Sequence, residues 1–319
     1  MYSDVIRSEE YKRKLLDFIQ QYYGLEAVGI APAKRGFYGE TWRLDTADGS
    51  FFLKLVYVAA HKLTYERSFP VIEHLHDHGI DFISRIAKTK DGRLSTQFDG
   101  AALGVFGWID GETIETDATK IPEYQMLAKI YQVPAHGVSI PREDFSGKIA
   151  GEFFAKWNAL KGEDVLSLLG KNRVKLEHRA ARLEYFAALC RNDTAGFVIT
   201  HGDAGGNLIV NGGRHFIVDW DDPLLAPPER DAWVMCGKAW AREAFESALR
   251  QNGIAYTLRP ERLAYYCHHF FFLYLIALIE GSTPVNEMEE YLEGWIRESI
   301  AYADEMAELI TCLPLASCC

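Results

Sequence analysis

The spacing of apolar residues changes about a third of the way along the 319-residue chain. Up to about residue 110, short segments rich in β-branched and aromatic residues alternate with Gly-containing turns, a pattern typical of strands joined by hairpins. After Gly111 the segments are longer and carry apolar residues at helical spacing. The pattern predicts an α+β protein, with a small β-rich half followed by a large α-helical half.

The β-rich half is predicted to start with a helix and to continue with strands around a Gly-containing loop. The loop contains Gly36 and Gly39, and an Ala-Asp-Gly turn at 47–49 leads into a third strand at Ser50–Val56. The other predicted elements are helices at 5–23 and 63–78 and strands at Phe82–Ala87 and Ala101–Ile109.

The helical half is interrupted by one short β insertion, at 197–220. Its predicted helices cover residues 120–133, 149–169, 171–191, 238–252, 259–280 and 287–311. The most apolar run, Leu263–Ile279, is shorter than a typical membrane span and contains His268 and His269. We therefore expect a buried helix of a large helical lobe, and no association with a membrane.

Lys54 is the one charged residue of the predicted third strand. Alternation along the strand places it on the same face as Phe52 and Val56. Two interpretations are open from its position alone. Lys54 is either an edge-strand lysine that reaches solvent, or a buried lysine that needs an acidic partner, for which Glu66 and Glu73 on the following helix are the candidates.

The segment from Thr200 to Asp231 contains five Asp and one Glu within 32 residues. Bringing so many carboxylates together is costly unless a cation, a basic substrate or hydrogen bonds compensate them. Two short strands around the Asn211-Gly212-Gly213 turn predict a hairpin. Asp203 and Asn207 precede this hairpin and Asp219 follows it, so the three side chains are expected to converge.

The three converging side chains suit a magnesium-dependent reaction. Mg²⁺ prefers oxygen ligands, usually one or two carboxylates together with phosphate oxygens. Asn207 and Asp219 offer an amide oxygen and a carboxylate, which leaves Asp203 to accept a proton from a substrate hydroxyl. The alternative is that Asp203 and Asp219 are only turn and capping residues.

The sequence HGDAGGN followed by IVDWD resembles the catalytic core of the aminoglycoside phosphotransferase and choline kinase group, which has the protein-kinase-like fold. The resemblance implies an ATP- or GTP-dependent enzyme. It also implies Asp203 as catalytic base, Asn207 and Asp219 as Mg²⁺ ligands, and His201 as a residue that shapes the loop.

The N-terminal half is similar to the same group. Lys54 resembles the lysine that binds nucleotide phosphates, and Glu66 resembles its ion-pair partner. Residues 106–109, with Phe106, Trp108 and Ile109, resemble the hinge that holds adenine. The implied architecture is bilobal, with a nucleotide-binding N-lobe at 1–105, a hinge at 106–111 and a C-lobe at 112–319.

A narrower resemblance, to the spectinomycin phosphotransferase branch, lies in VDWDDPLLAPPERD and ERSFPVIEHLHDHGI. Two segments depart from the group, because KRGFYGET differs from its paired-Gly loop and LAKIYQVPAHG stands where relatives often have a Leu-His step. In the acidic block, Arg230 and Asp231 are expected to brace a helix start. Asp221 and Asp222 are weaker candidates for binding ammonium groups of a substrate.

The charge of the chain favours a cationic substrate. The formal net charge is −11, which argues against general nucleic-acid binding. Residues 281–311 contain one basic residue, Arg297, and eight acidic residues, which form either part of an acceptor pocket or a solvated helix face. The acidic residues are Glu287, Glu289, Glu290, Glu293, Glu298, Asp304, Glu305 and Glu308.

The six cysteines form no CxxC pair, so zinc and redox motifs are not expected. Reduced thiols and the lack of an apolar secretory stretch at the N-terminus favour a cytoplasmic protein. The terminal Cys-Cys is not accompanied by a basic tail or a second anchor, so lipidation is not expected.

Together the motifs predict a small-molecule kinase that phosphorylates a hydroxyl of an aminoglycoside or an aminocyclitol such as spectinomycin. One alternative is a metabolic kinase of the same fold that acts on choline, homoserine or a sugar. The other is a non-catalytic nucleotide-binding protein, against which the complete set of Lys54, Asp203, Asn207 and Asp219 argues. The acceptor and the oligomeric state are left open by the sequence.

Overall fold

The computed structural model describes residues 7–33, 39–281, 283–294 and 296–312, which fold as two compact units. The N-terminal unit contains the described residues up to Pro141 together with His201–Leu224. The C-terminal unit contains Arg142–Thr200 and the described residues from Leu225 onward. The segment around Asp203 thus belongs to the same unit as the N-terminal strands. The lobe boundary at 106–111 does not coincide with this division and stays a prediction.

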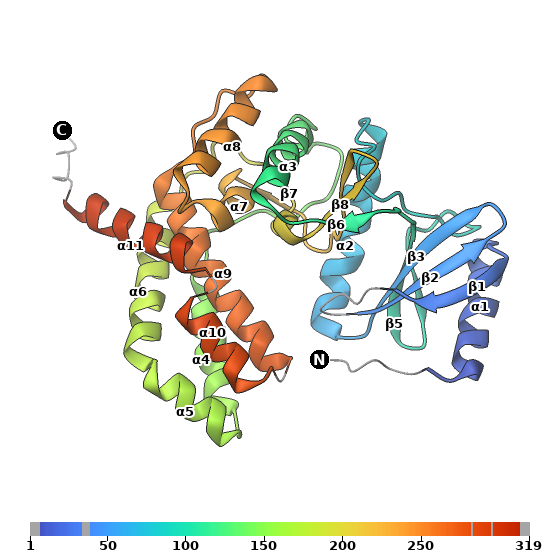
Figure 1. Ribbon diagram of the computed structural model, residues 1–319, viewed down its shortest axis with the longest axis horizontal. Helices are drawn as coiled ribbons and strands as arrows, with labels where there is room; N and C mark the ends of the chain where they lie inside the picture. Colours follow the sequence, from blue (N-terminus) through green and yellow to red (C-terminus); the bar gives the residue numbers. More distant parts are fainter. Residues whose placement is uncertain (1–6, 34–38, 282, 295, 313–319) are drawn as a thin grey trace. The chain divides into compact units, whose positions relative to one another are not determined.

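The strand that carries Lys54 is the middle one of a five-stranded sheet in the N-terminal unit (Figure 1). The sheet has the antiparallel order β1-β2-β3-β5-β4. Its strands are β1 Ala27–Pro32, β2 Glu40–Thr46, β3 Gly49–Val56, β4 Thr96–Phe98 and β5 Ala101–Gly107. Lys54 pairs with Thr41 on one side and with Gly104 on the other. The edge-strand interpretation of Lys54 is therefore wrong, because β3 is a central strand.

One face of the sheet is covered by α1, Glu9–Tyr23. Ser8 caps this helix by accepting a hydrogen bond from the Tyr11 N–H, and Gly24 ends it in the left-handed region at φ 75°. Leu15 and Ile19 are fully buried against the apolar face of the sheet. This packing is the hydrophobic core that keeps β3 in place.

The helix α2, Ala59–Asp77, packs close to β5. A Cβ atom at Gly104 would lie 2.5 Å from the Tyr65 hydroxyl and 2.8 Å from the Phe69 ring, so only glycine permits this approach. The predicted strand at Phe82–Ala87 does not form. That segment makes only isolated bridges, because it divides between two partners: Ile83 bridges to Ile217 of the β8–β9 hairpin, and Ile86 bridges to Phe106 of β5.

The predicted hairpin is formed by β8, Leu208–Asn211, and β9, Arg214–Ile217. A third strand, β6 Glu112–Thr113, pairs with β8. The helix α3, Asp117–Ile130, contacts β9 and the short 3-10 helix η1, Ala204–Gly206. The N-terminal unit thus fixes both ends of the segment that carries Asp203 and Asn207.

The C-terminal unit is built around one apolar helix, α9, which contacts α4, α6 and α11 (Figure 1). Its helices are α4 Lys148–Ala159, α5 Glu163–Lys171, α6 Arg173–Cys190, α7 Glu229–Ala232, α8 Ala239–Gln251, α9 Pro260–Glu280, α10 Val285–Glu293 and α11 Arg297–Cys312, with the short η2 Trp233–Met235 and the paired strands β7 Val198–Thr200 and β10 Leu224–Ala226. Among the described helices α9 is long and apolar enough to cross a membrane. Because 67% of its most apolar window is buried inside the protein, it is the core helix that the sequence predicted.

Two long helices expected from the sequence are each divided in two. The helix predicted at 149–169 breaks where Leu160 is extended and Gly162 follows, which separates α4 from α5. The helix predicted at 287–311 breaks at Gly294, between α10 and α11. Glycine favours such breaks because it has a low helix propensity and no Cβ atom.

The core of the N-terminal unit predicts a large difference between two leucine substitutions. Leu103 in β5 is fully buried, whereas Leu63 in α2 is 52% exposed. We expect Leu103→Ala to lower the free energy of unfolding by about 2–5 kcal/mol through lost burial and a cavity. Leu63→Ala should change it by less than about 0.5 kcal/mol. Urea denaturation measures both, and equal effects would contradict this assignment of the core.

Candidate active site

The Lys54 ammonium lies between two carboxylates of the acidic block. Its Nζ atom is 2.5 Å from Asp219 Oδ1 and 2.5 Å from Asp221 Oδ2. Lys54 itself is only 4% exposed, whereas the two Asp side chains are 37% and 34% exposed. The central strand β3 thus holds a buried cation whose partners reach the surface.

The pKa values of these three groups move in different directions. Burial lowers the pKa of Lys54, but the two carboxylates outweigh it and raise the value, so the ammonium stays protonated. Burial raises the pKa of Asp219, but the Lys54 charge outweighs it and lowers the value. For Asp221, burial and then the Asp219 carboxylate raise the pKa. Of the pair, Asp219 is therefore the carboxylate that is more readily ionised.

His201 joins the two ends of the catalytic segment through both of its ring nitrogens. The Asp203 backbone N–H donates a hydrogen bond to Nδ1 over 3.1 Å, and Nε2 lies 2.9 Å from the Val218 carbonyl oxygen. Since Nδ1 accepts and a carbonyl cannot donate, Nε2 carries the proton. The ring also packs edge-on against Trp220, with 4.6 Å between centroids. His201 thus links the Asp203 loop to Val218 and Trp220, and its loop-shaping role stays a prediction.

Asp203 and Asn207 lie together at the open end of the β8–β9 hairpin. The Asn207 amide nitrogen donates to the Asp203 carbonyl oxygen over 2.7 Å and lies 3.4 Å from its carboxylate Oδ2. The Val218 N–H donates to the Asn207 carbonyl oxygen over 2.9 Å, which places Asn207 beside the residue that precedes Asp219. Asp203 is exposed, so its carboxylate is accessible to a substrate.

Asp219 has an unusual backbone conformation, at φ 64°. This left-handed region is uncommon for residues other than glycine, and such strain clusters at functional sites. The conformation turns the chain directly after β9, so that both Asp219 and Asp221 reach Lys54. The strained position therefore coincides with the predicted metal ligand.

The residues present fit a magnesium ion by the chemistry of their donors. The Asn207 amide nitrogen is used in hydrogen bonds to Asp203, while its amide oxygen accepts none from the described residues. Together with the Asp219 carboxylate this gives two oxygen ligands of the kind that Mg²⁺ prefers. Within the described ranges no group of three or more His, Cys, Asp and Glu residues could hold a metal ion by itself. The remaining ligands would have to be water and phosphate oxygens.

The predicted ion pair between Lys54 and Glu66 is not formed. Tyr65, the preceding residue of α2, is directed at β3, and its hydroxyl donates to the Lys54 carbonyl oxygen over 3.2 Å. Because neighbouring residues on a helix point about 100° apart, Glu66 is directed elsewhere. It makes no ion pair with any residue that the structure describes. The other candidate, Glu73, pairs with Lys88.

The predicted hinge continues from β5. Phe106 is buried, and the backbone N–H groups of Gly107 and Trp108 already donate to the carbonyl oxygens of Arg85 and Ser50. A backbone N–H of this segment that donates to adenine would therefore have to come later, beginning with Ile109. Gly36 of the predicted Gly-containing loop lies outside the described residues.

Arg230 and Asp231 are both buried, at 5% exposure, in the short helix α7. Arg230 Nη1 donates to the Thr200 hydroxyl oxygen over 3.1 Å. Their burial agrees with the predicted bracing role. Asp222 lines a small cavity of about 180 Å³ with Thr64 and Arg67.

Two buried groups near the motifs are not singled out by the sequence. Lys120 on α3 is 3% exposed, pairs with Glu123 and donates to the Gly205 carbonyl oxygen, between Asp203 and Asn207. Glu229 is fully buried and accepts hydrogen bonds from the Tyr256 hydroxyl and the Arg259 N–H. Lys120 lies in a predicted helical segment and Glu229 lies in the acidic block. Neither position in the sequence indicates that tertiary packing buries the side chain.

The acidic residues of 281–311 lie mostly on the outer faces of α10 and α11. All of them except Asp304 are exposed, while Met288, Tyr291 and Leu292 face the core. This is the arrangement expected of a solvated helix face.

A buried strand lysine held by carboxylates, together with an exposed loop aspartate and its asparagine neighbour, defines a phosphotransferase of the kinase-like α+β class. Residues 29–266 match the family model described as "Phosphotransferase enzyme family". Because this match covers more than half of the 319 residues, the chain belongs to that family. A search of curated proteins found no match.

Three solved structures illustrate the similarity in fold. Spectinomycin phosphotransferase APH(9)-Ia, in complex with ADP and spectinomycin, has 20% identity and a TM-score of 0.67 over 92% of this chain and 94% of that one. Amicoumacin kinase hAmiN has 14% identity and a TM-score of 0.61 over 94% and 96% of the two chains. Macrolide 2'-phosphotransferase MphH from Brachybacterium faecium has 15% identity and a TM-score of 0.55 over 91% and 97%. The predicted α+β, kinase-like fold is confirmed.

Glu229 predicts a pH dependence of stability. Burial raises its pKa from 4.5 to about 7, although Arg259 and Tyr256 donate hydrogen bonds to the carboxylate. Between these two values the folded state keeps a proton that the unfolded chain has released, so stability falls as pH rises through this window. Glu229→Gln cannot ionise. The variant should therefore gain stability relative to the wild type between about pH 5 and about pH 8, by at most about 3 kcal/mol. This gain is measured as an increase in the Tm of the variant minus the Tm of the wild type.

The matched control is Glu289→Gln, at an exposed glutamate of α10. Its Tm difference from the wild type should be the same at both pH values. A Glu229→Gln difference that shrinks as pH rises would contradict the raised pKa.

Proposed function

We propose that this protein is an ATP- or GTP-dependent kinase that phosphorylates a hydroxyl group of an aminoglycoside or an aminocyclitol such as spectinomycin. The observation that carries the proposal is the arrangement of four side chains within one unit. Lys54 contacts Asp219, while Asp203 and Asn207 lie at the open end of the hairpin that precedes Asp219. Support for the nucleotide and the acceptor comes from the similar structure that contains ADP and spectinomycin.

In the proposed reaction, each residue of the site performs a task that its surroundings allow. Lys54 binds phosphate oxygens, for which its permanent charge and buried position suit it. The exposed Asp203 carboxylate orients the acceptor hydroxyl and takes its proton as the phosphoryl group transfers. Asn207 and Asp219 would hold Mg²⁺, which when bound neutralises phosphate charge. His201 and Lys120 keep the loop in position, so most of the rate arises from positioning and charge stabilisation.

The charge of the chain supports a cationic acceptor, since the formal net charge of −11 attracts polycations. The similar structures concern spectinomycin, a macrolide and amicoumacin, so the fold accommodates several acceptors. The second candidate function is therefore a kinase of the same fold that phosphorylates a metabolite. We further propose a cytoplasmic location, which agrees with the free thiols of Cys190, Cys236 and Cys267.

The proposal predicts the outcome of an ADP-release assay with Mg-ATP across a panel of acceptors. The panel contains spectinomycin, several aminoglycosides, choline, homoserine and methylthioribose. We expect turnover on spectinomycin or an aminoglycoside alone. Asp203→Ala should reduce that turnover by about 10²–10⁴-fold, because it removes the proton acceptor, while nucleotide affinity stays within about twofold.

Turnover on a metabolite alone would replace the antibiotic acceptor with the second candidate and leave the role of Asp203 intact. Turnover that survives Asp203→Ala would contradict the catalytic assignment. Loss of nucleotide binding in a folded Asp203→Ala protein would contradict it as well.

A further inference from the structure

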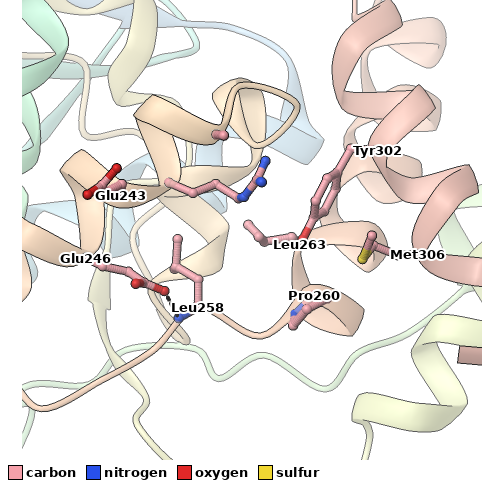
Figure 2. A pocket seen from close by; sticks show the side chains of 9 residues that line it. Glu243, Glu246, Leu258, Pro260, Leu263, Tyr302 and Met306 are labelled. Carbon is pink, nitrogen blue, oxygen red and sulfur yellow. Dashed lines mark hydrogen bonds between the residues drawn. The ribbon is translucent and has the colours of Figure 1, made fainter. Parts of the chain in front are cut away.

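A second cavity, of about 390 Å³, lies within the C-terminal unit (Figure 2). It is lined by one face of α8, Leu258 in the loop before α9, the first turn of α9 and two residues of α11. Its volume falls in the range of about 300–1,000 Å³ that is usual for small-molecule sites. None of Lys54, Asp203, Asn207 and Asp219 lines it, and all four belong to the other unit.

One wall of the cavity is apolar. Leu258 and Leu263 are buried, at 6% and 1% exposure, and Pro260 and Met306 complete the wall. Methionine is flexible and polarisable, so it adapts to ligands of different shape. This wall suits the hydrocarbon part of a ligand.

A hydroxyl group without a hydrogen-bond partner among the described residues points into the cavity. Tyr302 is 9% exposed, and Figure 2 shows its hydroxyl group directed toward Leu263 in the interior of the cavity. This hydroxyl forms no hydrogen bond with any residue in the described ranges. Because a tyrosine hydroxyl can both donate and accept a hydrogen bond, this group is available to a ligand in the cavity.

Arg242 lies beside the same ring, with its guanidinium carbon 4.9 Å from the ring centroid of Tyr302. One of its nitrogens, Nη1, donates to the Cys236 carbonyl oxygen. No described carboxylate forms an ion pair with Arg242. A guanidinium has five N–H donors arranged to bind a carboxylate through two hydrogen bonds, so most of this capacity is unused.

Two glutamates also line the cavity, and Figure 2 shows them across from Tyr302 and Met306. Glu246 is already engaged, because its Oε1 accepts a hydrogen bond from the Leu258 N–H and its Oε2 lies 3.6 Å from Arg250. Glu243 is exposed, so water screens its charge. The polar groups that remain for a ligand are therefore the Arg242 guanidinium and the Tyr302 hydroxyl.

We propose that this cavity binds a small amphipathic carboxylate. Its carboxylate group accepts hydrogen bonds from Arg242 and Tyr302, and its apolar part packs against Leu258, Leu263 and Met306. The site is additional to the kinase chemistry and does not rest on the proposed function.

Three probes with one carbon skeleton test the charge of the ligand: phenylbutyrate, phenylbutanol and phenylbutylamine. Isothermal titration calorimetry with the wild-type chain should give the tightest binding for phenylbutyrate. Arg242→Gln should weaken phenylbutyrate about tenfold by removing a charge-assisted pair. Tyr302→Phe should weaken it about threefold to fivefold by removing one hydrogen bond. Glu243→Gln should strengthen it about twofold by removing a screened repulsion.

Arg13→Gln, at an exposed arginine of α1, is the matched control and should leave all three affinities unchanged. Phenylbutyrate should also bind Asp203→Ala as it binds the wild type, which would separate this site from the acceptor chemistry. The proposal is overturned if phenylbutyrate binds no more tightly than phenylbutanol. It is equally overturned if its affinity is unchanged in both Arg242→Gln and Tyr302→Phe proteins that remain folded.

Discussion

The buried ammonium group of Lys54, held between Asp219 and Asp221, is the interaction on which the arrangement of the site depends. A charge inside a central strand cannot reach solvent, and an unpaired one would cost several kcal/mol. The partners come from a segment 165 and 167 positions further along the chain. The requirement to pair Lys54 therefore joins the N-terminal sheet to the β8–β9 hairpin within one unit. The left-handed backbone at Asp219 is the local distortion that allows it.

The same contact connects structure to chemistry. In the proposed reaction, the lysine and the carboxylates exchange partners, because nucleotide phosphates attract Lys54 and a divalent cation attracts Asp219. The exposure of both carboxylates, at about a third of each side chain, permits this exchange without unfolding the sheet. His201 is hydrogen-bonded to Asp203 on one side and to Val218 on the other. It therefore holds the Asp203 loop and Asp219 in fixed positions while the exchange takes place.

Local patterns in the sequence predicted much of this site, because its geometry arises from a turn. The Asn211-Gly212-Gly213 signal fixes the hairpin, and the hairpin places Asn207 beside Asp219. Long-range packing could not be predicted from the pattern of apolar and polar residues. The sequence predicts Glu66 as the ion-pair partner of Lys54. In the structure, α2 is oriented so that Tyr65 contacts β3, and Asp221 pairs with the Lys54 ammonium instead of Glu66. The burial of Glu229 likewise depends on neighbours that no periodicity reveals, whereas the helix breaks at Gly162 and Gly294 have a local cause in the low helix propensity of glycine.

The most direct test of the account is the affinity of Lys54→Met for Mg-ATP, measured by calorimetry on protein shown to be folded. Lys129→Met, at an exposed lysine of α3, is the matched control. If Lys54 binds the nucleotide phosphates, its loss should weaken Mg-ATP about tenfold or more, while the control keeps the wild-type affinity. An unchanged affinity in folded Lys54→Met protein would show that the buried lysine only holds the structure together, and would contradict its role in nucleotide binding.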